Sequence, residues 1–356
     1  MTYAERMARL ARGIADAGVD ALLVTNLTNV RYLTGFSGTN AQLLVSPTRA
    51  VFFSDRRYEA RAKALVTDAD IVIYKDKLQD VLGEHLGGVA RLGFEAQSAS
   101  VAERDALAEA LGNVELVPTK AQVETLRRFK DEGEVAAIRR AVEVADAGFS
   151  YILERLSAGR SEREVALDLE VFMRTNGAED VSFDLIVASG PLSAHIHHTA
   201  SERVLEKGDL VLLDFGARVD GYCSDCTRTV VLGPASDEQQ ALYELVLAAQ
   251  LAGIGAIAPG VACRDVDAAA RKVIAEAGYG DAFGHGLGHG VGLDIHEEPR
   301  FNEPSIDVLA GGEVMTVEPG VYLPGRGGIR IEDCVLVTDG GPEVLTGAPK
   351  DRLVET

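Results

Sequence analysis

The sequence predicts an α/β (α+β) protein of two domains, an N-terminal α/β domain over residues 1–125 and a pseudo-symmetric domain over residues 126–356. Up to about residue 120, short apolar runs alternate with amphipathic ones, which is typical of interleaved strands and helices. Around residues 118–134 the chain becomes polar and charged, so we place the boundary there. Beyond it, an order of two helices followed by strands occurs twice, which indicates two related lobes.

The first domain is predicted from its apolar periodicity. Met7, Leu10 and Ile14 recur at the spacing of one helical face. The polar cluster Ser54–Tyr58, with Asp55, Arg57 and Tyr58, closes a predicted strand, and we interpret it as an ordinary strand-to-helix cap, with a substrate contact as the alternative. The other predicted segments are strands at 21–25, 41–46, 50–55, 71–74 and 90–95 and helices from about 57, at 79–86 and at 102–111.

The second domain is predicted from two passes through one order of elements. In the first pass a long helix is followed by another that begins at Ser161, where Glu164 completes a capping box. In the second pass Ser236 and Gln239 form the capping box. The remaining predicted segments are strands at 182–189, 209–219 and 222–233, a helix at 264–277, and two strands near the C-terminal end.

Composition excludes several classes of function. Lys and Arg total 35 against 55 Asp and Glu, and a formal charge of −20 disfavours nucleic acid and anionic membrane surfaces as partners. No apolar run reaches the length of a membrane span, and the N-terminal segment lacks the apolar core of a signal peptide. Four cysteines in 356 residues make no disulfide framework. These features predict a soluble, cytoplasmic protein.

A histidine cluster occupies the stretch FGHGLGHGVGLDIHEEP at residues 283–299, which contains His285, His289 and His296. Alternate residues in its first part are glycine, and each glycine costs a helix roughly 1 kcal/mol relative to alanine. The two-histidine zinc helix is therefore excluded. In an extended chain His285 and His289 point the same way, which favours a binding site.

The first of two acid pairs flanks a predicted hairpin. Asp214 and Asp225 lie on either side of Val219-Asp220-Gly221, where Asp-Gly is a strong hairpin signal. Two registers are open, one with Asp214 opposite Asp225 and one with Asp214 opposite Thr227. Both bring the two carboxylates onto the same face of the hairpin.

The second acid pair is Glu318 and Glu332, which are placed symmetrically about the turn at residues 324–328. Two acid pairs in such apolar strands are costly to bury unless a cation neutralises them. Four carboxylates with His289 form an oxygen-rich set that suits Mn, Co, Fe or Zn. The number of acids indicates two ions, about 3.5–4 Å apart. Cys223 and Cys226 have no second cysteine pair as partner, and we interpret them as packing residues.

Four motifs together resemble the pita-bread metallopeptidases, the family of aminopeptidase P, prolidase and methionine aminopeptidase. They are DFGARVDGYCSDCTRT, GHGLGHGVGLDIHEEP, VMTVEPGVY and GIRIEDCVLV, in that order. The resemblance covers the chain from about residue 125 to near its end. The preceding part, with YLTGFSGTN and SDRRYEA, resembles the creatinase-type N-terminal domain. The fold implied is a creatinase-like domain followed by a pita-bread domain.

The resemblance also implies a set of metal ligands. By the family pattern Asp225 and Glu332 bridge two divalent ions, Asp214 holds one ion, and His289 with Glu318 holds the other. Manganese is the first expectation for the metal, with cobalt, zinc or iron as alternatives.

A further histidine is implied by the stretch LSAHIHH at residues 192–198, which resembles the family's NSALPHH. The match falls on His197. Leucine in place of asparagine and isoleucine in place of proline leave His195 and His198 as alternatives.

The activity implied is hydrolysis of Xaa-Pro peptide bonds by a hydroxide that bridges the two ions. Glu318 would carry the proton to the leaving nitrogen, and His296 or His197 would stabilise the carbonyl oxygen and contact the substrate. His285 and Arg330 would bind substrate by shaping the proline pocket. A homodimer and a proline-containing peptide or dipeptide are the expected partners.

Dipeptidase and aminopeptidase P activities remain open. The alternatives from other classes are a creatinase-like hydrolase of a small non-peptide amide and a catalytically inactive binding homologue.

Overall fold

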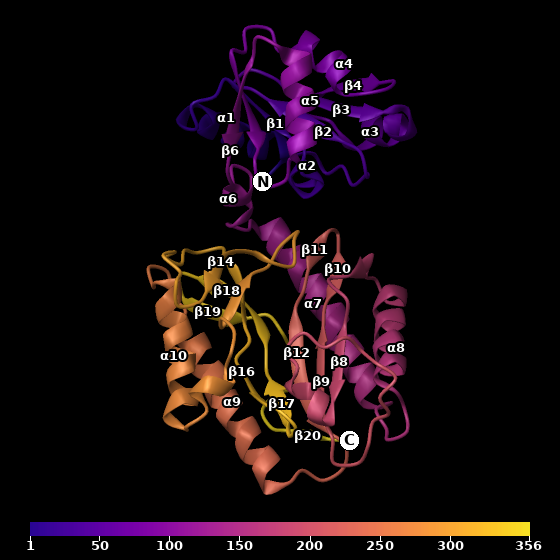
Figure 1. Ribbon diagram of the computed structural model, residues 1–356, viewed down its shortest axis with the longest axis vertical. Helices are drawn as coiled ribbons and strands as arrows, with labels where there is room; N and C mark the ends of the chain where they lie inside the picture. Colours follow the sequence, from indigo (N-terminus) through magenta and orange to yellow (C-terminus); the bar gives the residue numbers. More distant parts are fainter. The chain divides into compact units, whose positions relative to one another are not determined.

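The computed structural model describes residues 1–356 and divides into two compact units, Met1–Arg127 and Arg128–Thr356 (Figure 1). Both units mix helices and strands, as predicted. None of the helices is both long and apolar enough to cross a membrane.

The first unit is built on a six-stranded sheet of order β4-β3-β2-β1-β5-β6, in which every strand except β2 runs parallel to the others. Alternate strand residues such as Leu23, Phe53 and Leu92 pack with Leu82 and Leu107 in one apolar core. The strands are β1 Ala21–Val24, β2 Gln42–Val45, β3 Ala50–Asp55, β4 Asp70–Tyr74, β5 Arg91–Glu95 and β6 Glu115–Thr119. The helices are α1 Tyr3–Asp16, α2 Leu27–Thr34, α3 Glu59–Leu65, α4 Gln79–Leu82, α5 Val101–Leu111 and α6 Glu124–Arg127.

Three elements of this unit are absent from the sequence prediction, namely helix α2, the short helix α6 and strand β6. Helix α2 carries β-branched and polar residues that favour helix weakly, and it is bounded instead by its caps, Asn26 at the start and the left-handed Gly35 at the end. Strand β6 contains Pro118, which usually argues against a strand. Because β6 is an edge strand, proline is tolerated there.

The polar cluster after β3 is a cap, as predicted. The Asp55 carboxylate accepts a hydrogen bond from the backbone N–H of Arg57 and pairs with the Arg57 guanidinium at 2.7 Å. The Tyr58 hydroxyl contacts Thr39 Oγ1 at 2.6 Å. These residues lie beside a cavity of about 810 Å³ at the carboxyl ends of the parallel strands.

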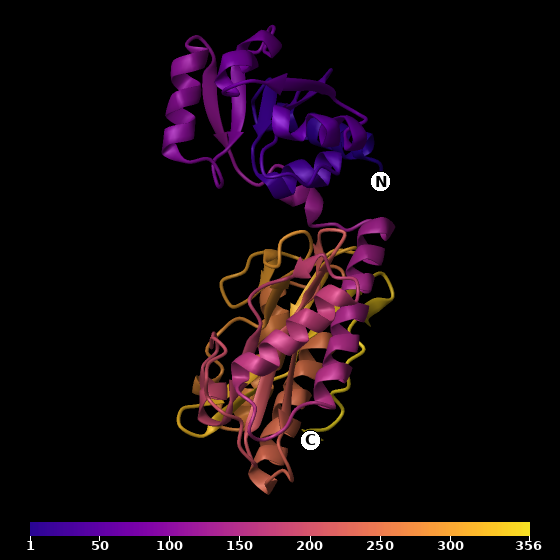
Figure 2. The same ribbon diagram turned by 90° about the vertical axis from the view of Figure 1, so that its right-hand side faces the viewer.

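The second unit repeats one arrangement in two lobes. Figures 1 and 2 show the strands between the helix pair α7/α8 and the helix pair α9/α10. The capping boxes predicted at Ser161 and Ser236 are both present. The first lobe contains α7 Glu132–Leu153, α8 Glu162–Thr175, β7 Asp180–Val181, β8 Ile186–Ser189, β9 Leu210–Phe215, β10 Ala217–Val219, β11 Tyr222–Cys223 and β12 Cys226–Val231. The second contains α9 Asp237–Gly255, α10 Cys263–Glu276, β13 Gly288–Gly290, β14 Glu297–Phe301, β15 Val314–Val317, β16 Gly320–Leu323, β17 Gly327–Arg330, β18 Asp333–Thr338 and β19 Gly341–Val344, and β20 Val354–Glu355 returns to β12.

Each lobe has its own apolar core. Phe149 and Leu169 of the first helix pair pack on β9 and β12, while Val246 and Ile274 of the second pair pack on the strands of the other sheet. The largest sheet of the first lobe has the order β20-β12-β9-β8 and that of the second β14-β13-β15-β18-β19, and one helix pair packs on each lobe.

The hairpin with Asp214 and Asp225 and the hairpin with Glu318 and Glu332 differ in how closely the spacing of the two acids predicts the strand register. In the first, Asp214 lies opposite Thr227, which is the later-turn register of the two left open. Asp220 and Gly221 both have positive φ, so they form the tight turn that sets this register. In the second, Val317 lies opposite Asp333 and Gly320 opposite Arg330, which places Glu318 and Glu332 symmetrically, as their spacing predicts.

Only β13 and the start of β14 form strands in the glycine-rich histidine stretch, so the extended part is shorter than predicted and His285 lies outside it. A Cβ on Gly288 would lie 2.1 Å from Thr316 O, and one on Gly290 would lie 2.8 Å from Glu298 O. The glycines therefore let β13 pass close to its neighbouring strands β14 and β15.

Candidate metal centre

One cavity of about 590 Å³ in the second unit is lined by all nine residues that the sequence singles out. Both lobes contribute to it. The five expected ligands come from β9, from the residue before β12, from β13, from the residue after β15 and from the residue before β18, and they are Asp214, Asp225, His289, Glu318 and Glu332.

The distances among these residues suit a metal site. His289 Nε2 lies 3.6 Å from Asp225 Oδ2 and 3.3 Å from Glu318 Oε1. One potential ligand atom each from Asp225, His289 and Glu332 lie within 4.8 Å of one another. These are spacings that a single cation can bridge.

The tautomer of His289 is fixed by its backbone. Its Nδ1 lies 3.0 Å from Gly290 O, so Nδ1–H donates and Nε2 faces the carboxylates. A lone pair directed at acids is repelled unless a proton or a cation lies between them. Histidine ligands in proteins are oriented in this way.

An unpaired acid oxygen provides a direct test of whether a cation fits. Asp214 Oδ2 accepts a hydrogen bond from Arg330 Nη2 at 2.6 Å, but Asp214 Oδ1 is buried and has no hydrogen-bond partner. Leaving a buried carboxylate oxygen unpaired costs free energy, and a bound cation would remove this cost. The residues present therefore fit a divalent metal.

The pKa values of the acids show the same demand for positive charge. Burial raises the pKa of Asp225 well above its usual range, and repulsion by Glu332, Asp214 and Glu318 adds to the effect. Burial also raises the pKa of Glu332 far above normal, with repulsion by Glu318 and Asp214. Without a cation these groups would hold protons instead.

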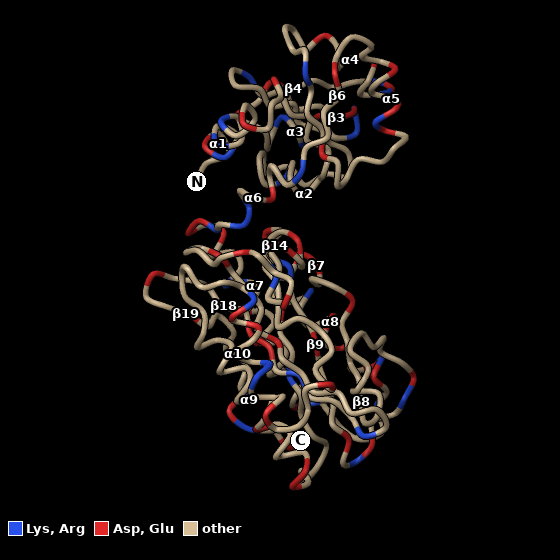
Figure 3. The backbone as a smooth tube through the Cα atoms, turned by 60° about the vertical axis from the view of Figure 1, so that its left-hand side comes forward, with Lys and Arg blue, Asp and Glu red and all other residues tan.

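The excess negative charge of the chain lies in the unit that contains this site. Residues 128–356 carry 39 Asp and Glu against 20 Lys and Arg, whereas residues 1–127 carry 16 against 15 (Figure 3). Such a field raises the local concentration of cations.

All four cysteines are free and buried, and the donors at the centre are oxygens and one imidazole nitrogen. Burial raises the pKa of Cys226 and Cys334 well above normal, so these thiols stay protonated. The donor set suits Mn, Co, Fe or Zn.

His285 and His296 have different environments. His285 Nδ1 donates to Gly286 O at 2.7 Å and its Nε2 accepts from the Tyr322 hydroxyl at 2.9 Å, so neither nitrogen is free. The His296 ring lies 4.4 Å from the His289 ring. Burial, with the nearby His289 and Arg300, lowers the pKa of His296 to about 4, so this ring is neutral at pH 7.

The three histidines of LSAHIHH take three different positions. His197 and His198 line the cavity, and His195 does not. His198 Nε2 is bound to Glu162 Oε2 at 2.7 Å. Of the two that line the cavity, His197 is thus the one whose ring is not held by a protein carboxylate.

Arg330 is almost completely buried at 2% exposure and is held by the site itself. Besides Asp214, its guanidinium donates to the Tyr322 hydroxyl at 2.9 Å and to Thr227 Oγ1 at 3.0 Å. Together with His285, these contacts form one chain from an expected ligand to the cavity wall.

Several supporting residues are missing from the sequence prediction. Thr227 donates to Glu332 Oε2 at 2.7 Å, Thr316 donates to Glu318 Oε1 at 3.1 Å, and Tyr322 joins His285 to Arg330. A signal exists for the threonines, because each lies two residues from an expected ligand and alternate residues of a strand share a face. Tyr322, four residues after Glu318, would share that face in a continuous strand, but the strand is interrupted between Val317 and Gly320.

A comparison with protein families decides the assignment of the second unit. Residues 136–339 match the model of "Metallopeptidase family M24", and residues 6–129 match "Creatinase/Prolidase N-terminal domain". The chain belongs to metallopeptidase family M24. The M24 family implies divalent metal ions, in agreement with the donor set, and the fold predicted from the resemblance is confirmed.

Known members resemble this M24 protein along its whole length. The structure of the Xaa-Pro dipeptidase from Bacillus anthracis has a TM-score of 0.97 and 43% identity and covers 100% of both chains. The X-Pro aminopeptidase from Thermotoga maritima has a TM-score of 0.91 and 36% identity, covering 97% of this chain and 100% of its own. An uncharacterized peptidase of Bacillus subtilis (strain 168), YqhT, is 40% identical over 351 residues, 98% of this chain and 99% of its own.

A buried acid, Glu162, holds the loop of the M24 unit that carries His197. Its side chain accepts hydrogen bonds from Ser189 N and Oγ, each at 2.7 Å, from Ser201 Oγ at 2.6 Å and from His198. Burial opposes the ionisation of Glu162, but these hydrogen bonds outweigh it and lower its pKa.

Replacing Glu162 with glutamine is expected to lower the free energy of unfolding by about 1–3 kcal/mol, because an amide N–H₂ would face buried donors and leave them unpaired. Urea denaturation measures this difference. Glu170→Gln on the same helix removes an exposed pair with Arg174 and serves as the control, with an expected change below about 0.5 kcal/mol. Equal effects of the two variants would contradict the prediction.

Proposed function

We propose that this metallopeptidase hydrolyses Xaa-Pro peptide bonds with two divalent ions held by Asp214, Asp225, His289, Glu318 and Glu332. The observation that carries the proposal is the buried carboxylate cluster around His289, in which Asp214 Oδ1 has no partner. The Xaa-Pro substrate class is supported by the names of full-length relatives that share 36–43% identity with this chain.

When bound, two divalent ions would polarise the scissile carbonyl and supply a water with a pKa near 7. Glu318 is suited to move protons in such a reaction. Burial opposes its ionisation, but the hydrogen bond and charge of His289, with His285 and Arg330, hold the pKa of Glu318 at about 2. It is therefore a carboxylate at neutral pH, able to accept a proton from water and pass it to the leaving nitrogen.

The leaving nitrogen of an Xaa-Pro bond is a tertiary amide nitrogen, and it must be protonated before it leaves. His296, neutral and beside His289, can donate one N–H to the carbonyl oxygen as negative charge develops there. His197 offers a second ring on the same cavity. His285 and Arg330, whose polar atoms are engaged with Tyr322, Gly286 and Asp214, would bind substrate by forming the rigid wall of the proline pocket.

The decisive experiment uses paired peptides that differ only beyond proline. With added Mn²⁺, Co²⁺ or Zn²⁺, we expect cleavage of an Xaa-Pro dipeptide, of the same sequence extended by two residues, or of both, and no cleavage of matched Xaa-Ala peptides. Cleavage of the dipeptide alone gives an Xaa-Pro dipeptidase, and release of the first residue from the longer peptide gives an Xaa-Pro aminopeptidase. Two bound metals with neither peptide cut would overturn the proline specificity.

Manganese is our proposed metal, and a homodimer our proposed assembly. Metal analysis of protein purified without chelators tests the first, and light scattering of the purified protein tests the second. We also retain a cytoplasmic location as a proposal, because unpaired cysteines are the usual state of proteins from a reducing compartment.

A further inference from the structure

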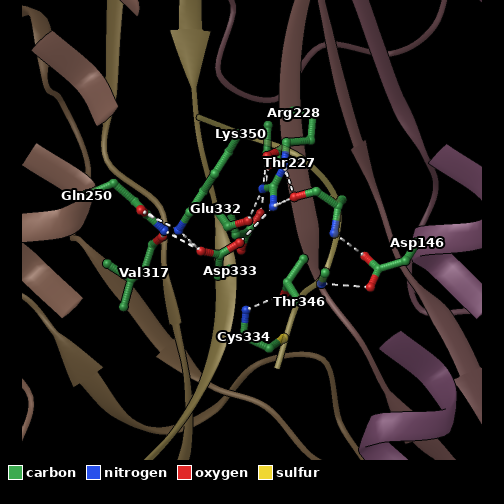
Figure 4. A network of polar contacts seen from close by, with 12 residues as sticks. Asp146, Thr227, Arg228, Gln250, Val317, Glu332, Asp333, Cys334, Thr346 and Lys350 are labelled. Atoms are coloured by element: carbon green, nitrogen blue, oxygen red, sulfur yellow. Dashed lines mark hydrogen bonds and ion pairs between the residues drawn. The ribbon is translucent and has the colours of Figure 1, made fainter. Parts of the chain in front are cut away.

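Directly behind the acid cluster lies a buried arginine that the proposed chemistry does not use. Arg228 is 1% exposed and is among the largest fully buried side chains of the chain. Its guanidinium donates to Thr227 O at 2.9 Å, to Ala348 O at 2.7 Å, to Asp333 Oδ1 at 2.8 Å and, by a short contact, to Glu332 O (Figure 4).

Asp333 connects this arginine to a second cation. Its Oδ1 is bound to Arg228, while its Oδ2 accepts from Gln250 Nε2 at 2.8 Å and from Lys350 Nζ (Figure 4). Lys350 also donates to Gln250 Oε1 at 2.8 Å. Asp333 and Gln250 are fully buried. Arg228, Gln250 and Lys350 together pair both carboxylate oxygens of Asp333, so no oxygen of this buried acid is left without a partner.

Arg228 and Asp333 lie close in the chain to the acids Asp225 and Glu332. Strand β12 begins one residue after Asp225, and strand β18 begins one residue after Glu332. These strands belong to different sheets. They are tied together here, because Glu332 N donates to Thr227 O at 3.1 Å and Arg228 reaches both residues.

The C-terminal segment closes the same network from a third side. Ala348 O accepts from Arg228, and Thr346 Oγ1 accepts from Cys334 N at 3.0 Å. The Tyr243 hydroxyl donates to Lys350 O at 2.9 Å. This segment therefore fixes Lys350 over the joint between β12 and β18.

Two buried carboxylates of like charge repel each other, and Asp225 and Glu332 come from separate lobes that could relax apart. We propose that Arg228, Asp333 and Lys350 form a positioning network that sets the separation of the Asp225 and Glu332 carboxylates, so that both can be shared between two ions. The inference rests on the proposed function, since it concerns the same centre. Residues that orient metal ligands typically alter metal affinity by about 10–100-fold when they are replaced.

The test compares Lys350→Met, which lies at the edge of the network, with Lys350→Arg, which keeps the positive charge. Arg228→Met is the stronger variant, and Lys350→Met decides the outcome if that protein does not fold. Arg160→Met is the control, because Arg160 also binds an acid, Asp168, and two backbone carbonyls but lies between α7 and α8. Mn²⁺ titration calorimetry gives stoichiometry and affinity, and electron paramagnetic resonance detects two coupled Mn²⁺ ions.

For Lys350→Met we expect about tenfold weaker binding of at least one Mn²⁺ and a smaller coupled-pair signal, with substantial recovery in Lys350→Arg. The control should match the wild type in both readouts. A folded Lys350→Met protein with wild-type affinity and signal would overturn the positioning role and leave the proposed function intact. A wild-type protein that binds fewer than two Mn²⁺ would instead overturn the two-ion centre itself.

Discussion

Glu318→Gln is expected to lower kcat on Xaa-Pro peptides by about 100- to 10,000-fold, the range that proton transfer by a positioned side chain contributes. The amide keeps an oxygen that can contact a metal, but it cannot accept a proton and return it. The substitution also removes a negative charge from the centre, at a position 3.3 Å from His289 Nε2. Steady-state kinetics at saturating metal separates the loss of proton transfer from the loss of metal.

The control for Glu318→Gln is Glu276→Gln, an exposed glutamate on α10 that faces Lys272. Its kcat should equal that of the wild type. Metal content is measured in both variants, since the prediction concerns a metal-loaded protein. A Glu318→Gln variant that retains two metals and more than a tenth of the activity would refute its role as the proton carrier.

Removing the divalent ions is expected to abolish activity and to make the free energy of unfolding fall as the pH rises. The pKa values of Asp225 and Glu332 are raised in the folded, metal-free protein above their ordinary values of 3.8 and 4.5. As the pH rises above those values, the unfolded chain releases protons that the folded chain keeps. Each retained proton then lowers the free energy of unfolding by about 1.4 kcal/mol per pH unit.

A bound cation replaces those protons, so the metal-loaded protein should lose this dependence, and metal affinity should rise with pH. Thermal unfolding between pH 5 and 8 measures the stability of chelator-treated and Mn²⁺-loaded protein. Groups that titrate elsewhere in the chain affect both forms equally, so they cancel in the difference between the two profiles. Asp225→Asn, which removes one of the two shifted acids, should flatten the metal-free profile. Parallel profiles with and without metal would contradict the explanation.

Local signals in the sequence predict most of the fold. The 3.6-residue period indicates α1, and the capping boxes at Ser161 and Ser236 mark the starts of α8 and α9, because a cap involves residues only three positions apart. The second acid hairpin is also predictable, since a symmetric spacing about one turn sets the register. Weak propensity and an edge proline conceal α2 and β6 for equally local reasons.

The sequence by itself determined which nine residues are expected at the site, because motif spacing and strand alternation are properties of neighbouring positions, and all nine line one cavity. Only the tertiary structure decided how they are used. The contact of His198 with Glu162 spans 36 positions, and those of Arg228 with Glu332 and Asp333 span more than 100. The packing of two lobes creates such long-range contacts, and no periodicity along the chain encodes which partner a buried polar group will find.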